Sequence, residues 1–442
     1  MTTPTANSPV STNTTATHFM TASGAPIWRL NSGADRRIKA GHPWVYSNEL
    51  QKSPKGITPG QKIMLADAGG KFLAWGYGNP SSLIAFRVLS RLETDTEAGT
   101  VRWFKERLKS AWTFRKDLGL DEESFRWVHG EGDGLPGLIV DRYLMSQTKT
   151  PTEVIVVQAH TAGMDALMGS ILESIEMLMN DRETPWGLVI RNDSASRKFE
   201  GLEIQEPVIH RKWEGNNIIQ VRGVGRKPIP FKVDLKAGQK TGFFLDQAEN
   251  INQVGEILIH SDLPKLVRIL DLCPYVGQWS AKLTQALRAH GHDVHVTLMD
   301  SSKDALHYAE ENVKNAGGQV KAIQGDVMED LKNLSEKSFD VVISDPPAFI
   351  KGRKDMGPGT AAYVKLNTEV FRLVAPSGFV AACSCSQLLG EEEFMTVLSK
   401  AARRNNRDCR WIARGTQAMD HPVRLEFNEG KYLKMWFGKV SE

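Results

Sequence analysis

The chain has 442 residues, of which 41% are hydrophobic and 24% charged, and this composition excludes a mostly disordered chain, a collagen and a coiled-coil rod. Its 55 basic and 52 acidic residues leave a net charge of +3, so a nucleic acid would have to be bound through a local patch. At about 150 residues per domain, this length predicts two or three domains.

Several signals of location and metal binding are missing. No apolar run reaches the roughly 20 residues that span a bilayer. Residues 1–25 have neither the basic and apolar regions of a secretory signal nor any Lys, Arg, Asp or Glu. Four cysteines are too few for a disulfide framework, and no His/Cys cluster has the spacing of a zinc site. We therefore expect a cytoplasmic protein with no metal and no membrane partner.

The first part of the chain predicts a tail and a small β-barrel. Residues 1–25 are mostly Thr, Ser, Asn, Ala and Pro, and we expect a disordered tail because they bury too little apolar surface to offset the entropy of ordering. In residues 26–95, strands expected at Lys62–Asp67, Lys71–Gly76 and Leu83–Ser90 alternate with Gly-rich turns, which indicates a barrel. Four of its aromatic residues are candidates for stacking on bases, although we expect at least two in the core. They are Trp44, Tyr46, Trp75 and Tyr77.

Residues 96–230 predict a central α+β domain. Apolar residues recur at helical spacing from Thr100 to about Gly119, and a second helix is expected over Gly163–Met179. A dense turn cluster lies at Glu131–Gly137. The expected strands are Phe125–His129, Leu138–Tyr143, Glu153–His160 and Gly187–Arg191.

Residues 231–442 predict a doubly wound, Rossmann-like parallel sheet, because strands and helices alternate strictly from about Leu266. The expected strands are Leu266–Leu272, Val294–Met299, Val320–Ile323, Phe339–Ser344, Gly378–Ser384 and Tyr432–Gly438. The expected helices are Ser280–His290, Ser302–Ala316, Asn367–Val374 and Glu391–Arg404. Ligands of such sheets bind beyond the carboxyl ends of the strands, so the residues there form the candidate site.

Four strand ends carry a carboxylate and the fifth a thiol. Asp300, about 20 residues after a glycine turn, can bind both hydroxyls of a ribose, the alternative being a helix cap. Asp326 is a candidate for an adenine amino group or a simple turn residue. Gly277 is expected to let the backbone approach the ligand, and the lack of a G-x-G-x-x-G motif argues against a dinucleotide.

The pentapeptide from Asp345 to Phe349 is the most informative motif. Pro346 and Pro347 fix the backbone after the strand, which aims the Asp345 carboxylate into the cleft, and Phe349 can stack on a flat base. Cys385 is expected on the neighbouring strand. A thiolate that adds to carbon 6 of a pyrimidine makes carbon 5 able to accept a methyl group, with Asp345 assisting at ring nitrogen 3. The alternative for this thiol is an inert small hydrophobic residue.

Three further features leave alternatives open. Lys351, Arg353 and Lys354 lie in a glycine-containing stretch and form either a phosphate-binding loop or a solvated charged loop. Cys383 points to the same sheet face as Cys385 but lies deeper, in the expected core. His421 either faces the site or orders a turn.

The chain resembles class I S-adenosylmethionine methyltransferases in five motifs that follow in order, DLCPYVG, LMDSS, GDV, DPPAF and SCS. It is more closely similar to the ribosomal RNA large subunit methyltransferase I family, whose members make 5-methylcytosine in 23S ribosomal RNA. That resemblance rests on GHPWVYSNEL, EGDGLPGLIVDRY, KTGFFLDQ and DHPVRLEFNEGKYLK, and it extends from about Arg36 to the C-terminus. It implies an N-terminal PUA-like RNA-binding barrel, a central domain and a C-terminal class I methyltransferase domain.

The resemblance also implies the site and its ligands. The cofactor would be S-adenosylmethionine and the partner structured or partly assembled ribosomal RNA. Cys385 would be the nucleophile and Asp345 its partner at the base. The cofactor would lie near Asp271, Tyr275, Gly277, Asp300, Ser301, Asp326 and Val327, with Gln247 contributing from the preceding segment. The RNA would contact Pro346, Pro347, Phe349, Lys351 and Arg353.

Two other functions are compatible with these residues. One is methylation of an exocyclic amino group of adenine or guanine in RNA, for which the DPPAF motif would hold the amine and no thiol would be needed. The other is a non-catalytic RNA-binding protein. A homodimer is also left open.

Overall fold

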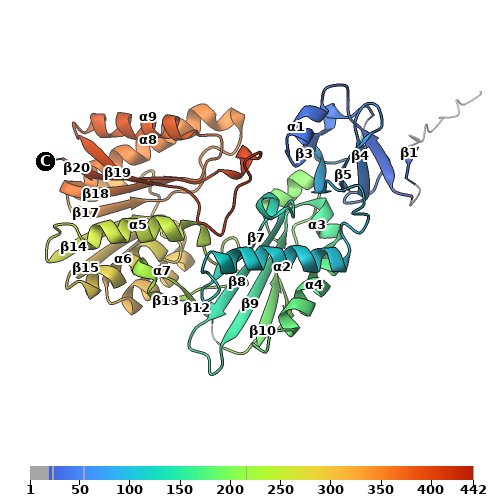
Figure 1. Cartoon of the computed structure of the whole chain (residues 1–442). Helices are drawn as coiled ribbons and strands as arrows, with labels where there is room; N and C mark the ends of the chain where they lie inside the picture. Colours follow the sequence, from blue (N-terminus) through green and yellow to red (C-terminus); the bar gives the residue numbers. More distant parts are fainter. Residues whose placement is uncertain (1–18, 22–23, 53–54, 216, 442) are drawn as a thin grey trace, which may run out of the picture.

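The computed structural model describes residues 19–21, 24–52, 55–215 and 217–441, which form three successive β-sheets with their helices (Figure 1). Most of the expected N-terminal tail lies outside these residues. Phe19–Met20, however, form the short strand β1, which pairs antiparallel with β2 (Pro26–Arg29). This pair corrects the expectation that the tail extends to residue 25.

The N-terminal sheet contains the three expected strands together with β1, β2 and β3, which were not predicted from the sequence. The other strands are β3 (Trp44–Tyr46), β4 (Lys62–Ala66), β5 (Phe72–Gly78) and β6 (Ile84–Ser90), and the helix α1 spans Asp35–Lys39. The strand order is β1-β2-β4-β5-β6-β3. Trp75 and Tyr77 are buried, but in the hydrophobic cluster of the central domain, where the Tyr77 hydroxyl donates to the carbonyl of Pro136 at 2.6 Å. The expectation that at least two of the four aromatic residues lie in the barrel core is therefore wrong, because the N-terminal sheet packs this side against the central domain. Trp44 and Tyr46 are only half-buried.

The central sheet has the order β11-β10-β9-β8-β12-β13, with β7 paired to β8. Its strands are β7 (Phe125–His129), β8 (Leu138–Met145), β9 (Thr152–Ala159), β10 (Trp186–Ile190), β11 (Val208–Arg211), β12 (Ile218–Arg222) and β13 (Pro228–Lys232). The helix α2 (Val101–Asp117) packs against α4 (Met168–Asn180). The single helix expected over Gly163–Met179 is in fact two, because Leu167 leaves helical geometry between α3 (Ala162–Ala166) and α4.

The C-terminal sheet is doubly wound but mixed rather than wholly parallel. Its strands are β14 (Leu266–Leu272), β15 (Asp293–Asp300), β16 (Gln319–Gln324), β17 (Phe339–Ser344), β18 (Val374–Ser384), β19 (Cys409–Gly415) and β20 (Lys434–Val440). The order is β16-β15-β14-β17-β18-β20-β19, and β20 runs antiparallel to both neighbours. The edge strand β19 was not predicted from the sequence.

Helices cover both faces of this sheet (Figure 1). They are α5 (Ala248–Ile259), α6 (Gln278–Ala289) and α7 (Lys303–Asn315) on one face, and α8 (Met356–Leu373) and α9 (Glu391–Arg404) on the other. The α8 helix begins well before the expected Asn367. Its first turn tolerates a proline, and a Cβ at Gly359 would lie 2.4 Å from the Ile350 side chain, so only glycine allows this close approach.

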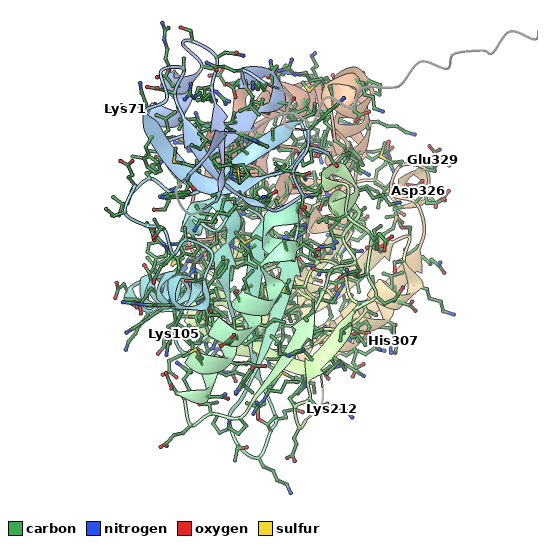
Figure 2. The ribbon with its side chains drawn as sticks, turned by 90° about the vertical axis from the view of Figure 1, so that its right-hand side faces the viewer. Lys71, Lys105, Lys212, His307, Asp326 and Glu329 are labelled. Carbon is green, nitrogen blue, oxygen red and sulfur yellow. The ribbon has the colours of Figure 1, made fainter. Side chains whose placement is uncertain are left out.

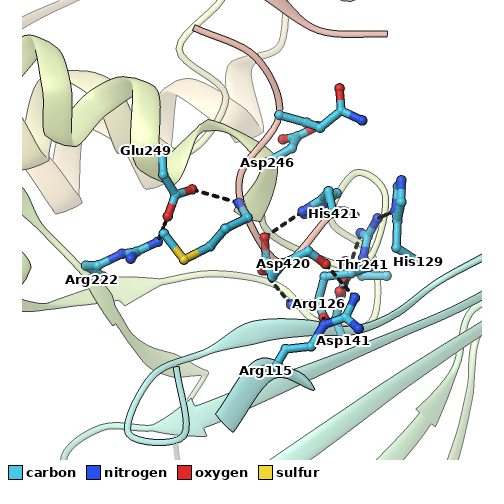
Figure 3. Close-up of polar contacts among 12 residues, drawn as sticks. Arg115, Arg126, His129, Asp141, Arg222, Thr241, Asp246, Glu249, Asp420 and His421 are labelled. Atoms are coloured by element: carbon cyan, nitrogen blue, oxygen red, sulfur yellow. Dashed lines mark hydrogen bonds and ion pairs between the residues drawn. The ribbon is translucent and has the colours of Figure 1, made fainter. Parts of the chain in front are cut away.

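The segment between β19 and β20, residues 416–433, extends from the C-terminal sheet towards the other two domains (Figure 1). We call it the C-terminal loop. Its Phe427 packs edge-on against Trp44 of the N-terminal sheet, with ring centroids 4.7 Å apart. Its Asp420 accepts hydrogen bonds from Arg115 and from the backbone of Arg126 in the central domain, at 2.6 and 2.7 Å (Figure 3). Within the described residues, no helix is long and apolar enough to cross a membrane.

Candidate active site

The candidate site lies where the strand order of the C-terminal sheet reverses. β14 has β15 on one side and β17 on the other, and Asp271 is in register with Leu298 and Ile343 of these neighbours. The crevice at such a reversal is the usual ligand site of an open α/β sheet. The expected adjacency of the fourth and fifth strands is confirmed, because β17 pairs parallel with β18.

Asp271 is a buried carboxylate with one unsatisfied oxygen. Its Oδ2 accepts a hydrogen bond from the backbone N of Ser280 at 3.2 Å, whereas its Oδ1 is buried without a partner. Burial raises the pKa of Asp271 to about 7. A buried acceptor that lacks a donor is costly unless a ligand supplies one, so this carboxylate fits the charged amino group of an S-adenosylmethionine methionine moiety.

Replacing Asp271 by asparagine should stabilise the protein without cofactor, and more so at higher pH. The folded state holds the Asp271 proton more tightly than the unfolded chain, so wild-type stability is lost as the pH rises from about 4 to about 7. The asparagine variant has no carboxyl group to ionise at this position. Above pH 7 its free energy of unfolding should therefore exceed that of the wild type, by at most about 4 kcal/mol. This prediction is checked by thermal unfolding of the wild type and of Asp271→Asn at pH 5 and at pH 8. It would be contradicted if the two proteins differed in unfolding midpoint by the same amount at both pH values.

The loop after β14 takes an unusual path. Cys273, Tyr275 and Gly277 all have positive φ angles, of 59°, 51° and 75°. The Tyr275 hydroxyl accepts a hydrogen bond from the backbone N of Gln239 at 2.8 Å and donates one to the carbonyl of Gly242 at 3.1 Å. Tyr275 therefore ties the loop to the segment that precedes the sheet.

Gly277 has a packing role that the sequence did not reveal. We expected it to admit a ligand to the backbone, but a Cβ at Gly277 would lie 3.0 Å from the Cα of Ala309 in α7. The glycine thus allows the start of α6 to approach α7 closely. No other residue combines this small size with an easy positive φ.

Alanine at Gly277 should therefore destabilise the protein more than alanine at an uncrowded glycine of the same conformation. The strained φ costs about 1–2 kcal/mol, and crowding against Ala309 adds about 1–3 kcal/mol. Gly291 is the matched control, since its φ is +88° and nothing lies within 4 Å of an added Cβ. Urea denaturation of both variants checks this, and equal midpoints would show that crowding at Gly277 contributes nothing.

The residues expected near the adenosine lie at the ends of β15 and β16. Asp300 accepts a hydrogen bond from the backbone N of Ser302 at 2.9 Å, but Ser302 rather than Asp300 caps α7. Ser301 is exposed and Val327 is buried in the core. Asp326 lies at the periphery of the molecule (Figure 2), where its carboxylate accepts from the backbone N of Met328 at 2.8 Å, as a turn residue does.

Asp345 is held by two donors. Its Oδ2 accepts hydrogen bonds from Gln247 Nε2 at 2.8 Å and from Trp279 Nε1 at 3.1 Å. Burial nevertheless raises the pKa of Asp345 to about 6. Gln247, expected to contact the cofactor, donates this hydrogen bond to Asp345, and Asn250 orients Gln247 by donating to its Oε1 at 2.7 Å. Trp279 was missed because nothing in the residues around it marks a contact with a distant strand end.

Cys385 lies beside the DPPAF motif. Its thiol points to the carbonyl of Pro346, with the sulfur 3.8 Å from that oxygen. Burial, followed by the nearby Asp345 charge, raises the pKa of Cys385 to about 11, so this side chain is a thiol at neutral pH. Cys383 is buried in the core, as expected.

Two lysines that were not predicted from the sequence interact electrostatically with Cys385. Lys240 opposes the rise in the Cys385 pKa. Lys434 donates hydrogen bonds to the carbonyls of Ser386 and Tyr432 at 2.7 and 3.0 Å, and burial lowers the pKa of Lys434 to about 8, although the Cys385 charge opposes this. Both would stabilise a Cys385 thiolate.

Ser386 joins the two strand-end loops. Its Oγ accepts a hydrogen bond from the backbone N of Ile350 at 3.1 Å and shares one with the hydroxyl of Tyr363 at 2.9 Å. Phe349 packs against Tyr363, with ring centroids 4.7 Å apart. The DPPAF loop is therefore anchored to the loop that carries Cys385.

The basic residues after this motif are exposed. Lys351 and Arg353 lie in a short segment before α8. Two glycines of the glycine-containing stretch in which we expected a loop, Gly357 and Gly359, belong instead to the first turn of α8. Pro346 is buried and Pro347 exposed.

A buried polar network lies between the C-terminal loop and the central domain, and Figure 3 draws the part of it around Asp420 and His421. The Asp246 Oδ2 accepts from the Tyr432 hydroxyl at 2.7 Å and from Lys240 at 3.0 Å. Burial opposes ionisation of Asp246, but the Lys240 charge holds its pKa below the usual value. His421 is buried against Asp420, with Nδ1 and Oδ1 2.7 Å apart, so it orders the C-terminal loop.

Comparisons with known proteins agree with this architecture. Residues 29–91 match the family model of a PUA-like domain, and residues 265–435 match that of a methyltransferase domain. Two solved structures share the fold over 94% of this chain and all of their own, at 17% identity. One is a putative methyltransferase in complex with SAH, with a TM-score of 0.73, and the other is a putative SAM-dependent methyltransferase from Streptococcus mutans, with a TM-score of 0.71.

The fold and the strand-end site thus define a class I S-adenosylmethionine-dependent methyltransferase with an N-terminal PUA-like domain. Ribosomal RNA large subunit methyltransferase I of Klebsiella pneumoniae is 30% identical over 94% of this chain and 98% of its own length. The protein of that name from Salmonella arizonae is 30% identical over 92% of this chain and 95% of its own. The chain belongs to the ribosomal RNA large subunit methyltransferase I family.

Proposed function

We propose that this protein methylates carbon 5 of a cytosine in 23S ribosomal RNA through a covalent adduct between Cys385 and carbon 6. The observation that carries the proposal is the position of the Cys385 thiol against Pro346, next to Asp345, at the ends of the adjacent strands β17 and β18. The names of the relatives and the PUA-like domain support ribosomal RNA as the substrate.

The residues around the crevice suit the cofactor. When bound, S-adenosylmethionine supplies an electrophilic methyl group. Asp271 would hold its methionine amino group through the unpartnered Oδ1, and Asp300 its ribose hydroxyls. Tyr275 and Gly277 would shape the loop between them.

Asp345 and Cys385 would divide the chemistry on the base. A base would first take the proton of the Cys385 thiol, and Lys240 and Lys434 would stabilise the resulting thiolate. The sulfur would then bond to carbon 6 and the electron pair of the 5,6 double bond would move to carbon 5. Carbon 5 would take the methyl group as the bond from that methyl to the cofactor sulfur breaks, leaving S-adenosylhomocysteine. With a pKa of about 6, Asp345 is partly protonated near neutral pH and can share its proton with ring nitrogen 3. Loss of the carbon 5 proton to a base then expels the thiolate and restores the ring.

The product identifies the reaction. The protein would be incubated with unmodified 23S ribosomal RNA and methyl-tritiated S-adenosylmethionine, and the RNA would be digested to nucleosides and separated by chromatography. We expect label in 5-methylcytidine. Label in a methylated adenosine or guanosine would overturn the cytosine chemistry and favour an amino-group methyltransferase.

We also predict the domain boundaries, the RNA contacts, the location and the oligomeric state of the protein. We place the domains at residues 26–95, 96–230 and 231–442. Each range holds most of one sheet, although β1 (Phe19–Met20) precedes the first range and β13 (Pro228–Lys232) crosses the boundary at residue 230. We also expect RNA contacts at Phe349, Lys351 and Arg353, a cytoplasmic location, and either a monomer or a homodimer.

A further inference from the structure

A cleft of about 710 Å³ lies where the N-terminal sheet, the central domain and the C-terminal loop meet. The chemistry proposed above does not use it. Aromatic side chains from all three parts line it, namely Trp44, Tyr46, His160, Phe199, Phe427 and Tyr432. Its volume falls within the usual range for sites that enclose a small ligand.

The cleft is continuous with the loop that carries the candidate nucleophile. Gln387, two residues after Cys385, lines it and donates a hydrogen bond to the carbonyl of Glu429 in the C-terminal loop at 2.6 Å. Tyr432 lines it too, and its hydroxyl bonds Asp246 in the buried polar network. An RNA strand whose target base lies at Cys385 would therefore have its neighbouring nucleotides at this cleft.

The walls of the cleft offer uncharged aromatic faces. Two large apolar side chains that line the cleft, Phe199 and Leu83, are 82% and 80% exposed, and apolar side chains that gather in this way mark a binding site more often than ones scattered singly. The Trp44 indole is fixed, since its Nε1 donates to Glu131 at 2.8 Å. Burial lowers the pKa of His160 to about 4, so its imidazole is neutral at physiological pH.

The charges of the cleft do not suit a phosphate. Among the described lining residues, Arg87 is the only Lys or Arg, and it is buried in an ion pair with Glu200, whose carboxylate lies 2.7 Å from the guanidinium. Glu131 and Glu429 line the cleft as well. Acidic groups repel the backbone of a nucleic acid, whereas aromatic faces stack on any base.

We propose that this cleft binds an unpaired nucleobase next to the target nucleotide, stacked on Phe199 and facing Trp44. The inference rests on the RNA substrate of the proposed function, but it is independent of the Cys385 chemistry. It assigns the three-domain junction a role in holding the unpaired strand, while contacts elsewhere bind phosphates.

The test is RNA binding by the full-length protein with saturating S-adenosylhomocysteine, so that no turnover occurs. Filter binding of a radiolabelled, unmodified 23S ribosomal RNA transcript would compare the wild type with Phe199→Ala, Phe199→Tyr and Phe114→Ala. Phe114 is the matched control, a 41% exposed phenylalanine in α2 that is outside the described lining of the cleft. S-adenosylhomocysteine affinity, measured by calorimetry, would show that each variant is folded.

We expect Phe199→Ala to bind the transcript about tenfold more weakly, and Phe199→Tyr and Phe114→Ala to bind like the wild type. The slope of log affinity against log KCl should be the same for all four proteins, because stacking releases no counterions. Equal affinities of Phe199→Ala and Phe114→Ala, or a smaller slope for Phe199→Ala, would overturn the cleft proposal. A wild type that does not bind the transcript would instead overturn the RNA substrate of the proposed function.

Discussion

Replacing Cys385 by alanine should reduce methyl transfer at least about 10³-fold and leave the affinity for S-adenosylmethionine unchanged. Without the sulfur no adduct forms at carbon 6, and carbon 5 stays too poor a nucleophile to take the methyl group. Cofactor binding should persist because the thiol bonds to the carbonyl of Pro346 rather than to the Asp271 end of the crevice. Single-turnover methylation and calorimetry with S-adenosylmethionine measure the two quantities.

A stable covalent complex between the protein and a modified RNA tests the role of Cys385 directly. In RNA that carries 5-fluorocytidine, carbon 5 has no proton to lose after methyl transfer, so the bond between sulfur and carbon 6 should persist through a denaturing gel. Cys383→Ala is the control, since Cys383 is buried in the core two residues away. A trapped complex with Cys383→Ala and none with Cys385→Ala is expected. Methylation by Cys385→Ala at the wild-type rate would exclude the covalent mechanism.

Replacing Asp345 by asparagine should lower the rate of the chemical step about 10²- to 10⁴-fold. Asparagine keeps an oxygen that can accept from Gln247 and Trp279, at 2.8 and 3.1 Å in the wild type, but its amide is too weak an acid to transfer a proton to ring nitrogen 3. The loss should fall on kcat more than on KM, because the proton matters most in the transition state.

The control for Asp345 is the same change at Asp293, an exposed aspartate at the amino end of β15. Steady-state kinetics with the 23S transcript would compare the two variants. Unchanged kcat and KM in both variants would show that Asp345 has a structural role only. A rise in KM alone would show that it binds the base without assisting the reaction.

The centre of the C-terminal sheet was predictable because its strands β14, β17 and β18 are mostly buried on both faces and form nearly continuous apolar runs in the sequence. Phe339–Ser344 and Glu391–Arg404 have the expected bounds. The edge strand β19 was missed because its exposure alternates along the strand, so its residues do not form an apolar run. The early start of α8 was missed because Gly357 and Gly359 read locally as a loop, and only packing against Ile350 explains them.

The central residues of the candidate site could also be predicted from the sequence. A carboxylate or thiol directly after each buried strand must lie at one edge of a doubly wound sheet, so Asp271, Asp345 and Cys385 could be placed together from the strand pattern. The side chains that surround these three residues could not be placed from the strand pattern. Trp279 and Lys434 reach the site from a helix and an antiparallel strand whose positions no local pattern specifies.

Periodicity within a few neighbouring residues was enough to predict the order of the elements, the class of the C-terminal sheet and the residues at its strand ends. The way in which the three domains meet became known only from the folded chain. It brings Phe427 onto Trp44, and it buries Asp271 and Asp345 deeply enough to raise their pKa values to about 7 and about 6. Contacts between distant segments and the desolvation of a charge depend on the packing of whole domains, which local sequence does not encode.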